Sequence, residues 1–497
     1  MVPQSPALVV VVPLIFAFLS LLFGRWRKSL SYPITLIALS LSFLASIGCL
    51  YTVLTTGTIH YYLGKWAPPW GIEYVVDHLN GFILVIVSFV GLVVAISSKR
   101  VVEKELPEKV VYFYTIFLLQ VTGFLGIVVT GDMFNLYVFL EIASLAGYAL
   151  IAVGEEGAPF ASFNYLIFGT IGACFYLLGV GYLYIKTGSL NMADLSELLP
   201  ALYQSKVIMV AFAFFLVGVS LKMALFPLHV WLPDAYTYAP SAVSALVAPL
   251  MTKVGAYVMI RILFTVFEPR FSIELIPATT ILGWMATGAI LFGALMALAQ
   301  SDLKRMLTYI LVAEVGYIAL GVGLANRNGL TGAILHILND SFMMLALFLI
   351  VGAIMYRSGN REIPGLRYMH RRMPLTMAVL VITGLSVIGI PPTCGFFSKW
   401  YLVLGAIDAN QWVFVAVLLI SSLINVALFF RVIENVYLEP REEEGVHETI
   451  GETIAVEEAP LSLLTPILIA GAGILSLGIL SGKIIASVIQ FAVPAGF

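Results

Sequence analysis

Long apolar stretches alternate with short polar connections along the whole chain. A bilayer core requires about 20 consecutive, mostly apolar residues for each helix that crosses it. Fourteen stretches meet this requirement, so we predict about fourteen transmembrane helices, numbered here as spans 1–14 in chain order. They lie at roughly 3–23, 30–55, 78–98, 110–130, 132–153, 160–186, 206–228, 240–266, 274–299, 304–323, 330–356, 374–405, 411–437 and 461–491.

The composition agrees with a membrane protein. Of the 497 residues, 61% are hydrophobic and 11% are charged, whereas a soluble domain has about 45–50% and about 25%. A chain of this size cannot hide so much apolar surface from water, which excludes a soluble protein. The formal net charge of −2 argues against nucleic acid as a partner, because nucleic-acid binding requires a basic face. We therefore predict an all-α polytopic protein of the cell membrane, a single membrane domain over residues 1–497 that contacts the lipid bilayer.

No resident cofactor is predicted from the cysteines or from any motif. Cys49, Cys174 and Cys394 lie within apolar runs and have neither the spacing of a disulfide framework nor a C-x-x-C metal spacing. We interpret them as small packing residues. The chain has no recognisable motif for a nucleotide, an iron–sulfur cluster or a metal, so we expect no cofactor, no metal and no catalytic residue of its own.

Basic residues in the connections predict the orientation. The connections after odd-numbered spans hold 15 Lys and Arg residues, those after even-numbered spans hold 5, and the remaining 6 lie within spans. Because cytoplasmic loops carry the excess of basic residues, we predict that the odd connections are cytoplasmic and that both termini are external. The first span is followed rather than preceded by basic residues, unlike a cleavable signal peptide. The acidic stretch Glu439–Glu458 is then expected to be a solvated cytoplasmic loop.

Ionisable residues occur where the bilayer core is expected. A charged side chain at mid-bilayer costs at least ~2.5–3.5 kcal/mol, and such residues face the bundle interior or water. His336 and Asp340 are four residues apart and share one helix face. Buried ion pairs that hold helices together would account for one or two such residues, but a series over successive spans favours ion translocation. The members of this series are Glu141, Lys222, Lys253, His336, Asp340 and Lys399, with Glu314 as a further candidate.

Two spans contain helix breakers next to their lysines. In span 7, Lys222 precedes FPLHVWLPDAY, and in span 12, GIPPTCGFFSK leads to Lys399. Proline removes a backbone donor and clashes with the preceding turn, and irregular backbone at membrane depth survives only where protein or a water-lined cavity satisfies it. We predict that helices 7 and 12 are broken, which is typical of transport sites; simple packing kinks are the alternative.

The spacing of these charges indicates an internal repeat. Glu141 and Lys222 are 81 residues apart, and Glu314 and Lys399 are 85 apart; a further basic residue follows each lysine by 31 and 32 residues. Consecutive units of five spans face opposite ways, so the units are predicted to be inverted repeats, a common plan of transporters. They comprise residues 110–266 (spans 4–8) and 274–437 (spans 9–13), with flanking spans in 1–98 and 461–491.

Four segments resemble a known family. They are GDMFNLYVFLEIASLAGYALIA (131–152), LKMALFPLHVWLPDAYTYAPSAVSALVAPLMTKVGAY (221–257), SDLKRMLTYILVAEVGYIALG (301–321) and GIPPTCGFFSKWYL (389–402). They resemble the antiporter-like subunits of respiratory complex I, membrane-bound hydrogenases and Mrp-type cation/proton antiporters, and are most similar to the D-type chain of Mrp antiporters. The resemblance extends through nearly all spans, and segment 221–257 is highly specific.

The resemblance implies which residues form the ion path. The family's span 5 glutamate corresponds to Glu141, its lysines in spans 7, 8 and 12 to Lys222, Lys253 and Lys399, and its span 11 histidine to His336.

Two positions in the second unit depart from the family pattern. The family commonly has a lysine near Met344, so His336 and Asp340 are left to serve span 11, and Glu314 stands where small or polar residues are more usual. The second half of the path is therefore expected to be arranged differently.

A mechanism follows as a hypothesis. A carboxylate favours the charged form of an adjacent lysine, whereas burial disfavours it. A Glu141–Lys222 pair of changing separation would therefore switch the lysine between holding and releasing a proton. Ions would enter beside this pair, cross the midplane through the ionisable residues of spans 8 and 11, and leave near Lys399, with Glu314 as its partner.

Further polar residues are secondary candidates. His229 lies in the span 7 break, where a structural role is favoured over a place in the relay. Asp234 is expected to bind free backbone amides near that break, with gating as the alternative. Arg431 and Glu434 are three residues apart and are expected to pair near a helix end.

We therefore predict an antiporter-like subunit that translocates H⁺, Na⁺ or both within a multi-subunit respiratory or Mrp-type complex. Its partners would be other membrane subunits, antiporter-like or of iron–sulfur and hydrogenase type, and any redox chemistry would belong to them. The alternatives are a stand-alone cation/proton secondary transporter, a non-conducting scaffold of such a complex, and a membrane oxidoreductase with its own haem or quinone site. The last is disfavoured because neither His229 nor His336, the candidate axial ligands, lies in a recognisable haem attachment motif.

Overall fold

The computed structural model describes residues 4–437, 456–494 and 496–497, and these are almost entirely helical. In chain order the helices are α1 (Ser5–Trp26), α2 (Ser31–Thr56), α3 (His78–Glu105), α4 (Val110–Val129), α5 (Met133–Ala152), α6 (Ala158–Thr187), α7 (Met192–Leu198), α8 (Lys206–Lys222), α9 (Leu232–Tyr238), α10 (Ser241–Arg261), α11 (Ala278–Leu298), α12 (Leu303–Gly323), α13 (Arg327–Ser358), α14 (Met369–Arg372), α15 (Pro374–Ile388), α16 (Cys394–Asp408), α17 (Trp412–Tyr437), α18 (Leu461–Ile484) and α19 (Gln490–Ala492).

Twelve helices within the described residues are long and apolar enough to cross a membrane. They coincide with twelve of the predicted spans, which confirms the polytopic helical class. The other two predicted spans, 206–228 and 374–405, are divided: the first contains α8 and then irregular chain, and the second contains α15 and α16. The total of fourteen crossings and the two inverted repeats stay predictions.

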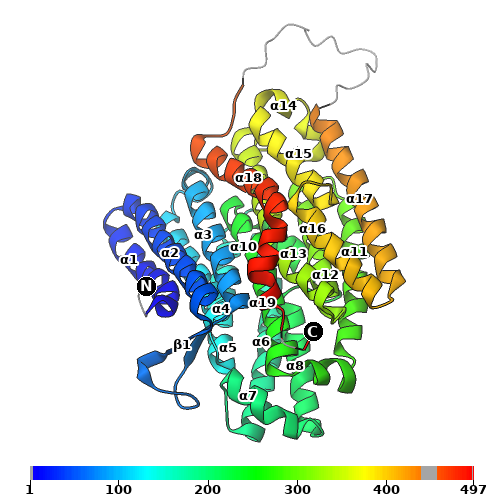
Figure 1. Cartoon of the computed structure of the whole chain (residues 1–497). Coiled ribbons are helices and arrows are strands. Elements are labelled where there is room, and N and C mark those ends of the chain that lie inside the picture. The colour runs from blue at the N-terminus through cyan, green and yellow to red at the C-terminus, as the bar shows by residue number, and fades with distance from the viewer. Residues whose placement is uncertain (1–3, 438–455, 495) are drawn as a thin grey trace, which may run out of the picture.

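Two helices form the interior of the bundle. All of the most apolar segment of α10 is buried, and so is 94% of that of α13, whereas only 33% is buried in α1. Figure 1 shows α10 and α13 in the middle of the molecule, with α1 and α2 at one side and α17 at the other. The central helices carry ionisable residues at membrane depth, which need protein or water as partners, whereas the apolar stretches of the outer helices can face lipid.

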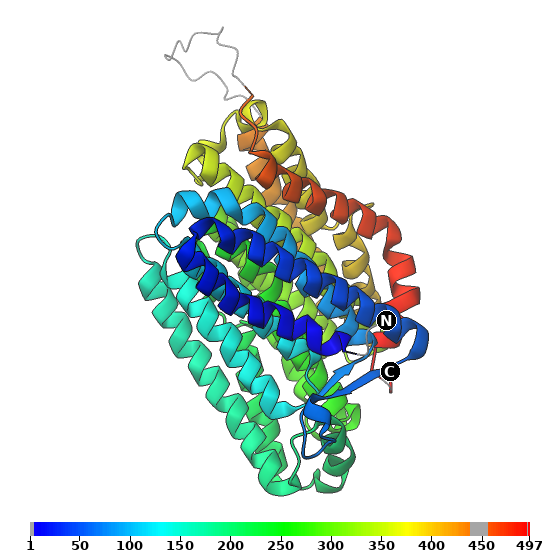
Figure 2. The same cartoon turned by 90° about the vertical axis from the view of Figure 1, so that its left-hand side faces the viewer.

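A short hairpin interrupts the helical pattern. Strands β1 (Ile59–Tyr62) and β2 (Glu73–Val76) pair antiparallel, with Ile59 opposite Val76. The prediction of an all-α chain missed this hairpin, because two four-residue strands are too short to establish a period of two. Both termini lie on the hairpin side of the molecule (Figure 2).

The connections predicted to be cytoplasmic meet at the other end of the bundle. Helix α3 begins beside the hairpin and ends at this face. Arg361 donates hydrogen bonds to Glu155 at 2.9 Å and to Asp302 at 2.5 Å, and so joins three of these connections. Most of the predicted acidic loop, residues 439–455, lies outside the described residues.

Both predicted helix breaks are present. Helix α8 ends at Lys222, Ala224 adopts a left-handed conformation with φ of 55°, and α9 starts at Leu232. Helix α15 ends at Ile388, and α16 starts six residues later. Gly395 is required at the second break, because a Cβ atom there would lie 2.0 Å from the Ser386 carbonyl oxygen. Each break therefore ends a helix close to a lysine of the predicted series.

Candidate functional site

The first break holds a lysine against a carboxylate. Lys222 Nζ lies 3.4 Å from Glu141 Oε1 and donates a hydrogen bond to Ser144 Oγ at 2.8 Å. Glu141 and Ser144 are three residues apart on α5 and therefore share one helix face. The lysine side chain is 6% exposed and the glutamate 24% exposed. The predicted Glu141–Lys222 pair thus exists, and Ser144 is a partner that the sequence did not reveal.

The central helices carry an ion pair in the interior. Lys253 on α10 pairs with Asp340 on α13, and the two side chains are 2% and 0% exposed. Lys253 Nζ also donates a hydrogen bond to the Ala248 carbonyl oxygen at 2.9 Å. Removing one member of such a pair would leave an uncompensated buried charge, which is strongly unfavourable. The two residues therefore depend on each other.

A buried histidine joins α12 to α13. Glu314 Oε2 lies 3.0 Å from His336 Nε2, and both side chains are fully buried. His336 Nδ1 lies 2.9 Å from Ser398 Oγ on α16. Glu314 also interacts electrostatically with Lys399 and Lys253. His336 and Asp340 lie on one face of α13, as predicted, but they contact different helices.

The second break holds its lysine without a direct carboxylate. Lys399 Nζ donates hydrogen bonds to the Val387 carbonyl oxygen at 2.6 Å and to the Tyr317 hydroxyl at 3.5 Å. It also lies 4.4 Å from the centre of the Tyr317 ring, and the Tyr317 hydroxyl is 2.6 Å from Ser421 Oγ. The expectation that Glu314 is the direct partner of Lys399 is wrong, because the imidazole of His336 occupies that carboxylate.

These contacts form a series through packed helices. Helix α8 packs on α10, α10 on α13, α13 on α12, and both α12 and α13 pack on α16. A cavity of about 30 Å³ lies beside Lys222, and its lining includes Ser144 from α5 and Met251 and Gly255 from α10. A volume of this size is sufficient for water. The fold therefore places the six main residues of the predicted series and Glu314 on consecutively packed helices, in separate contacts.

The secondary candidates have other contacts. The His229 ring lies against the rings of Phe226 and Phe292, and its Nδ1 atom has no hydrogen-bond partner among the described residues. This packing agrees with the structural role favoured for it.

Asp234 does not bind free amides near the break. It forms an ion pair with Arg305 on α12 at 3.1 Å, and no side-chain cap of α9 is formed. The expectation was wrong because folding brings the start of α12 to this point, and a guanidinium is a stronger partner for a carboxylate than neutral amides.

Arg431 does not pair with Glu434. Its guanidinium donates hydrogen bonds to the carbonyl oxygens of Leu298 at 2.7 Å and Gln300 at 2.8 Å. These carbonyl groups lie at the end of α11, where a helix has no internal donors left and its dipole favours a cation. Arg431 therefore stabilises a helix end and lies outside the series.

Several site residues could not be identified from spacing alone. Ser144, Tyr317 and Ser398 are neutral residues on helices, and only their distance from a charged residue marks them; Ser398 directly precedes Lys399. No group of three or more His, Cys, Asp or Glu side chains in the described ranges is arranged to hold a metal ion. Of the cysteines, Cys49 and Cys394 are buried, but Cys174 is exposed, so its interpretation as a core residue was wrong.

Known proteins share this architecture. A family model described as NADH:quinone oxidoreductase/Mrp antiporter, TM, matches residues 130–425. The N-type chain of an NADH-quinone oxidoreductase from Desulforudis audaxviator is 47% identical over 503 residues, which cover 99% of each chain. The D-type chain of a Na⁺/H⁺ antiporter from Alkalihalophilus pseudofirmus is 32% identical over 464 residues, 92% of each chain. A solved chain of the membrane-bound sulfane sulfur reductase, an archaeal respiratory membrane complex, is 30% identical with a TM-score of 0.89, covering 99% of this chain and 98% of that chain.

Proposed function

Because this chain belongs to the NADH:quinone oxidoreductase/Mrp antiporter transmembrane family, we propose that its buried ionisable series translocates H⁺, Na⁺ or both. It is an antiporter-like, multi-pass membrane subunit, and its relatives are named as subunits of multi-subunit systems. The proposed path begins at Glu141 and Lys222, continues through Lys253 and Asp340, and ends beyond His336 at Lys399.

The observation that carries this proposal is the order of acid–base side-chain pairs on consecutively packed helices. Single buried pairs could only fix helix positions. Here the pairs lie on α5 and α8, then on α10 and α13, then on α12 and α13, and a further lysine follows on α16. A protein that needed only rigidity would not retain so many costly charges at membrane depth.

Unsatisfied polar atoms support a hydrated route. Glu314 Oε1, Asp340 Oδ1 and Asn339 Oδ1 are buried and accept no hydrogen bond from the residues that the structure describes. Buried polar atoms nearly always have a partner in protein or ordered water. All three atoms belong to residues on α12 and α13, between the two breaks, where ions would have to cross the centre of the bundle.

The first step in the proposed path is exchange at Lys222. With Glu141 at 3.4 Å, the ammonium form is favoured, and a larger separation would favour release of the proton. The released proton would pass across the small cavity toward α10 and the Lys253–Asp340 pair. His336 would then connect this pair to the second break, because an imidazole can both accept and donate a proton, and Glu314 lies 3.0 Å from it.

The two inverted repeats belong to the same proposal. Helices α5, α6 and α8 pack in succession around the first lysine, and α12, α13 and α16 pack in succession around the second. In both units an acid lies one helical turn before a hydroxyl residue that contacts the lysine. Units of residues 110–266 and 274–437 would therefore supply two half-channels that meet at the bundle centre.

Orientation and partners are proposed from charge and kinship. The excess of basic residues after odd spans supports a cytoplasmic position for that face and an external position for both termini. The names of the relatives support other membrane subunits as partners, of antiporter-like and respiratory type. The driving reaction would then take place in those partners.

The test compares ion transport by the assembled complex in sealed vesicles. Glu141→Gln and Lys222→Ala are expected to reduce transport by about tenfold or more, the effect of about 1.4 kcal/mol on the barrier. Lys206→Ala is the matched control, because Lys206 lies at the exposed start of the same helix α8. Unchanged transport in both site variants would refute the path and leave the scaffold alternative. Transport by the purified chain alone would instead favour the stand-alone transporter.

A further inference from the structure

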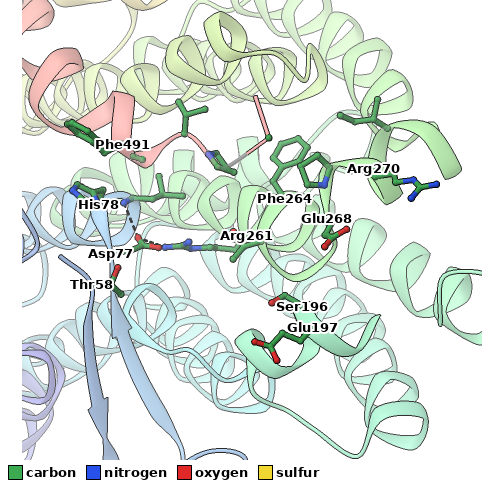
Figure 3. A pocket seen from close by; sticks show the side chains of 18 of the residues that line it. Thr58, Asp77, His78, Ser196, Glu197, Arg261, Phe264, Glu268, Arg270 and Phe491 are labelled. Carbon is green, nitrogen blue, oxygen red and sulfur yellow. Dashed lines mark hydrogen bonds and ion pairs between the residues drawn. The ribbon is translucent and has the colours of Figure 1, made fainter. Parts of the chain in front are cut away.

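A large cavity lies at the end of α10 on the side of the termini. Its volume is about 1050 Å³, and its walls come from the start of α3, the end of α10, α7 and the C-terminal residues. Figure 3 shows Arg261 extending from α10 to Asp77 at the start of α3, with Glu197, Ser196 and Glu268 placed around them. None of these residues belongs to the path described above.

The lining of the cavity carries more acidic than basic side chains. Asp77, Glu197, Glu268 and Glu274 contribute four carboxylates to its lining, against the two guanidinium groups of Arg261 and Arg270 and the ring of His78. Arg270 is paired with Glu274 at 3.7 Å. Clefts lined mainly by one sign of charge raise the local concentration of counter-ions.

One face of α10 connects this cavity to the central ion pair. Lys253, Tyr257 and Arg261 follow one another at intervals of four residues and so lie on the same helix face. Arg261 Nε donates a hydrogen bond to the Tyr257 hydroxyl at 3.1 Å, and Tyr257 donates one to the Val128 carbonyl oxygen at 2.9 Å. The eight residue-to-residue steps from Lys253 to Arg261 span only about 12 Å.

An ion pair lies in the cavity wall, between the end of α10 and the start of α3. Arg261 Nη2 donates a hydrogen bond to Asp77 Oδ1 at 2.5 Å. Burial raises the pKa of Asp77, but the Arg261 guanidinium and the backbone N–H groups at the start of α3 outweigh burial and hold that pKa below its usual value. Both members are thus charged, and their side chains are only 11% and 27% exposed, respectively.

The opposite end of α10 also meets a cavity. About 350 Å³ is enclosed there by residues that include Glu105, Glu155 and Pro240, and Glu105 accepts hydrogen bonds from the backbone and hydroxyl of Ser241. The 21 residues of α10 span about 30 Å. The helix that carries Lys253 therefore extends from one cavity to another at the opposite end of the bundle.

We propose that the cavity beside Arg261 is an aqueous ion vestibule that opens along α10 to the Lys253–Asp340 pair, with the Arg261–Asp77 pair as its gate. This inference rests on the proposed function of Lys253. When the gate is open, a proton leaves the Lys253 ammonium for vestibule water, which yields the neutral amine and a hydrated proton; loading is the reverse. No redox partner takes part in this step.

The test blocks the vestibule in the assembled complex. In a Cys174→Ser background, which removes the exposed native thiol, Thr265→Cys places a thiol in the cavity lining. A bulky, membrane-impermeant thiol reagent is added on the side of the termini, and transport is measured before and after modification. We expect a loss of about tenfold, in line with the effect of charged clefts on ion arrival. Thr55→Cys, exposed at the end of α2 outside the cavity, is the matched control and should be modified without loss.

The outcomes separate this inference from the proposed function. Thr265→Cys that is modified without any loss of transport, or that stays unmodified while Thr55→Cys reacts, overturns the vestibule. Lys253→Ala in the same vesicles reports on the path itself. If it abolishes transport and the blocked vestibule does not, only the vestibule is refuted; if it transports normally, the path is refuted.

Substitutions that neutralise one or both members of the Arg261–Asp77 pair test its role as a gate. Asp77→Asn keeps a residue that caps helices well but leaves Arg261 uncompensated, and transport is expected to fall by about threefold to tenfold. The double variant Asp77→Asn with Arg261→Gln removes both charges and should restore transport to more than half of the unmodified level. A double variant as slow as the single one would show that the pair acts only in folding, which overturns the gate.

Discussion

The two lysines at the helix breaks are held in different ways. Lys222 lies 3.4 Å from the carboxylate of Glu141 and donates to the hydroxyl of Ser144. At the second break, Lys399 donates to a backbone carbonyl and to the Tyr317 hydroxyl. In both places a hydroxyl residue one helical turn after an acid contacts the lysine. Only the first lysine has the acid itself within ion-pair distance.

A histidine accounts for the difference. His336 lies 3.0 Å from Glu314 and takes up the carboxylate that would otherwise be the counterpart of Glu141. The first site is also less enclosed, since Glu141 is 24% exposed and Glu314 is fully buried. The comparison teaches that the same order of residue types can produce two arrangements. At the first break the acid pairs directly with the lysine, and at the second break the acid pairs with a histidine instead. In the proposed path, the first site would exchange ions beside a partly exposed acid, and the second would pass charge to Lys399 from a fully buried one.

The largest expected effect is a difference between Glu314 and Glu141 in their contribution to the free energy of unfolding. Glu314→Gln should lower the free energy of unfolding by about 3–5 kcal/mol, because it removes one member of a fully buried pair. Glu141→Gln should cost about 1 kcal/mol or less, since that pair is partly open. The measurement is the thermal unfolding midpoint of the detergent-solubilised complex. Equal shifts for the two variants would contradict the difference drawn between the sites.

A double variant sharpens this prediction. Glu314→Gln combined with His336→Gln replaces both partners by neutral amides, so less is left unpaired than in the single variant. The double variant should unfold at a higher temperature than Glu314→Gln alone. If the two losses are simply additive, the Glu314–His336 contact does not stabilise the second unit.

A smaller effect on ion transport is expected from the hydroxyl groups of Tyr317 and Ser144, which contact the two lysines. Tyr317→Phe removes one of the two donor contacts of Lys399 but retains the ring, and should slow ion transport about fivefold, the effect of about 1 kcal/mol. Ser144→Ala should slow it less, since Lys222 keeps its carboxylate. Transport in sealed vesicles containing the complex is the measurement. A larger effect of Ser144→Ala would reverse the ranking and show that the carboxylate does not dominate at the first lysine.

The smallest effect concerns the chain beyond the first break. Asp234→Asn removes an ion pair with Arg305 in which the two side chains are 40% and 34% exposed, respectively, so the cost should be about 0–1 kcal/mol. Transport should stay within about twofold of the unmodified complex, the effect of about 0.4 kcal/mol on the barrier. A loss of transport comparable to that of Glu141→Gln would show that Asp234 gates the first site. The irregular chain after Lys222 would then take part in transport as Lys222 itself does.

The fold class and the positions of the charged residues were predictable from the chain, and several contacts were not. Apolar runs of bilayer length identify helices because the period and length of each run are local properties. The hairpin at Ile59–Val76 was missed because its strands are short. The partners assigned to Asp234 and Arg431 were wrong, because both residues bind groups far away in sequence. Asp234 binds the guanidinium of Arg305, and Arg431 binds free carbonyl oxygens at the end of α11.

Sequence alone determined that this chain crosses a membrane many times, that its helices break beside two lysines, and which residues carry charge into the apolar interior. These features depend on residue type and on neighbours within a few turns. Tertiary structure alone decided that Glu314 pairs with His336 and not with Lys399, that Lys253 pairs with Asp340, and that Arg261 pairs with Asp77 beside a cavity. Such choices depend on the angle and depth at which helices pack, and a difference of a few ångströms in a medium of low dielectric constant decides which charges pair.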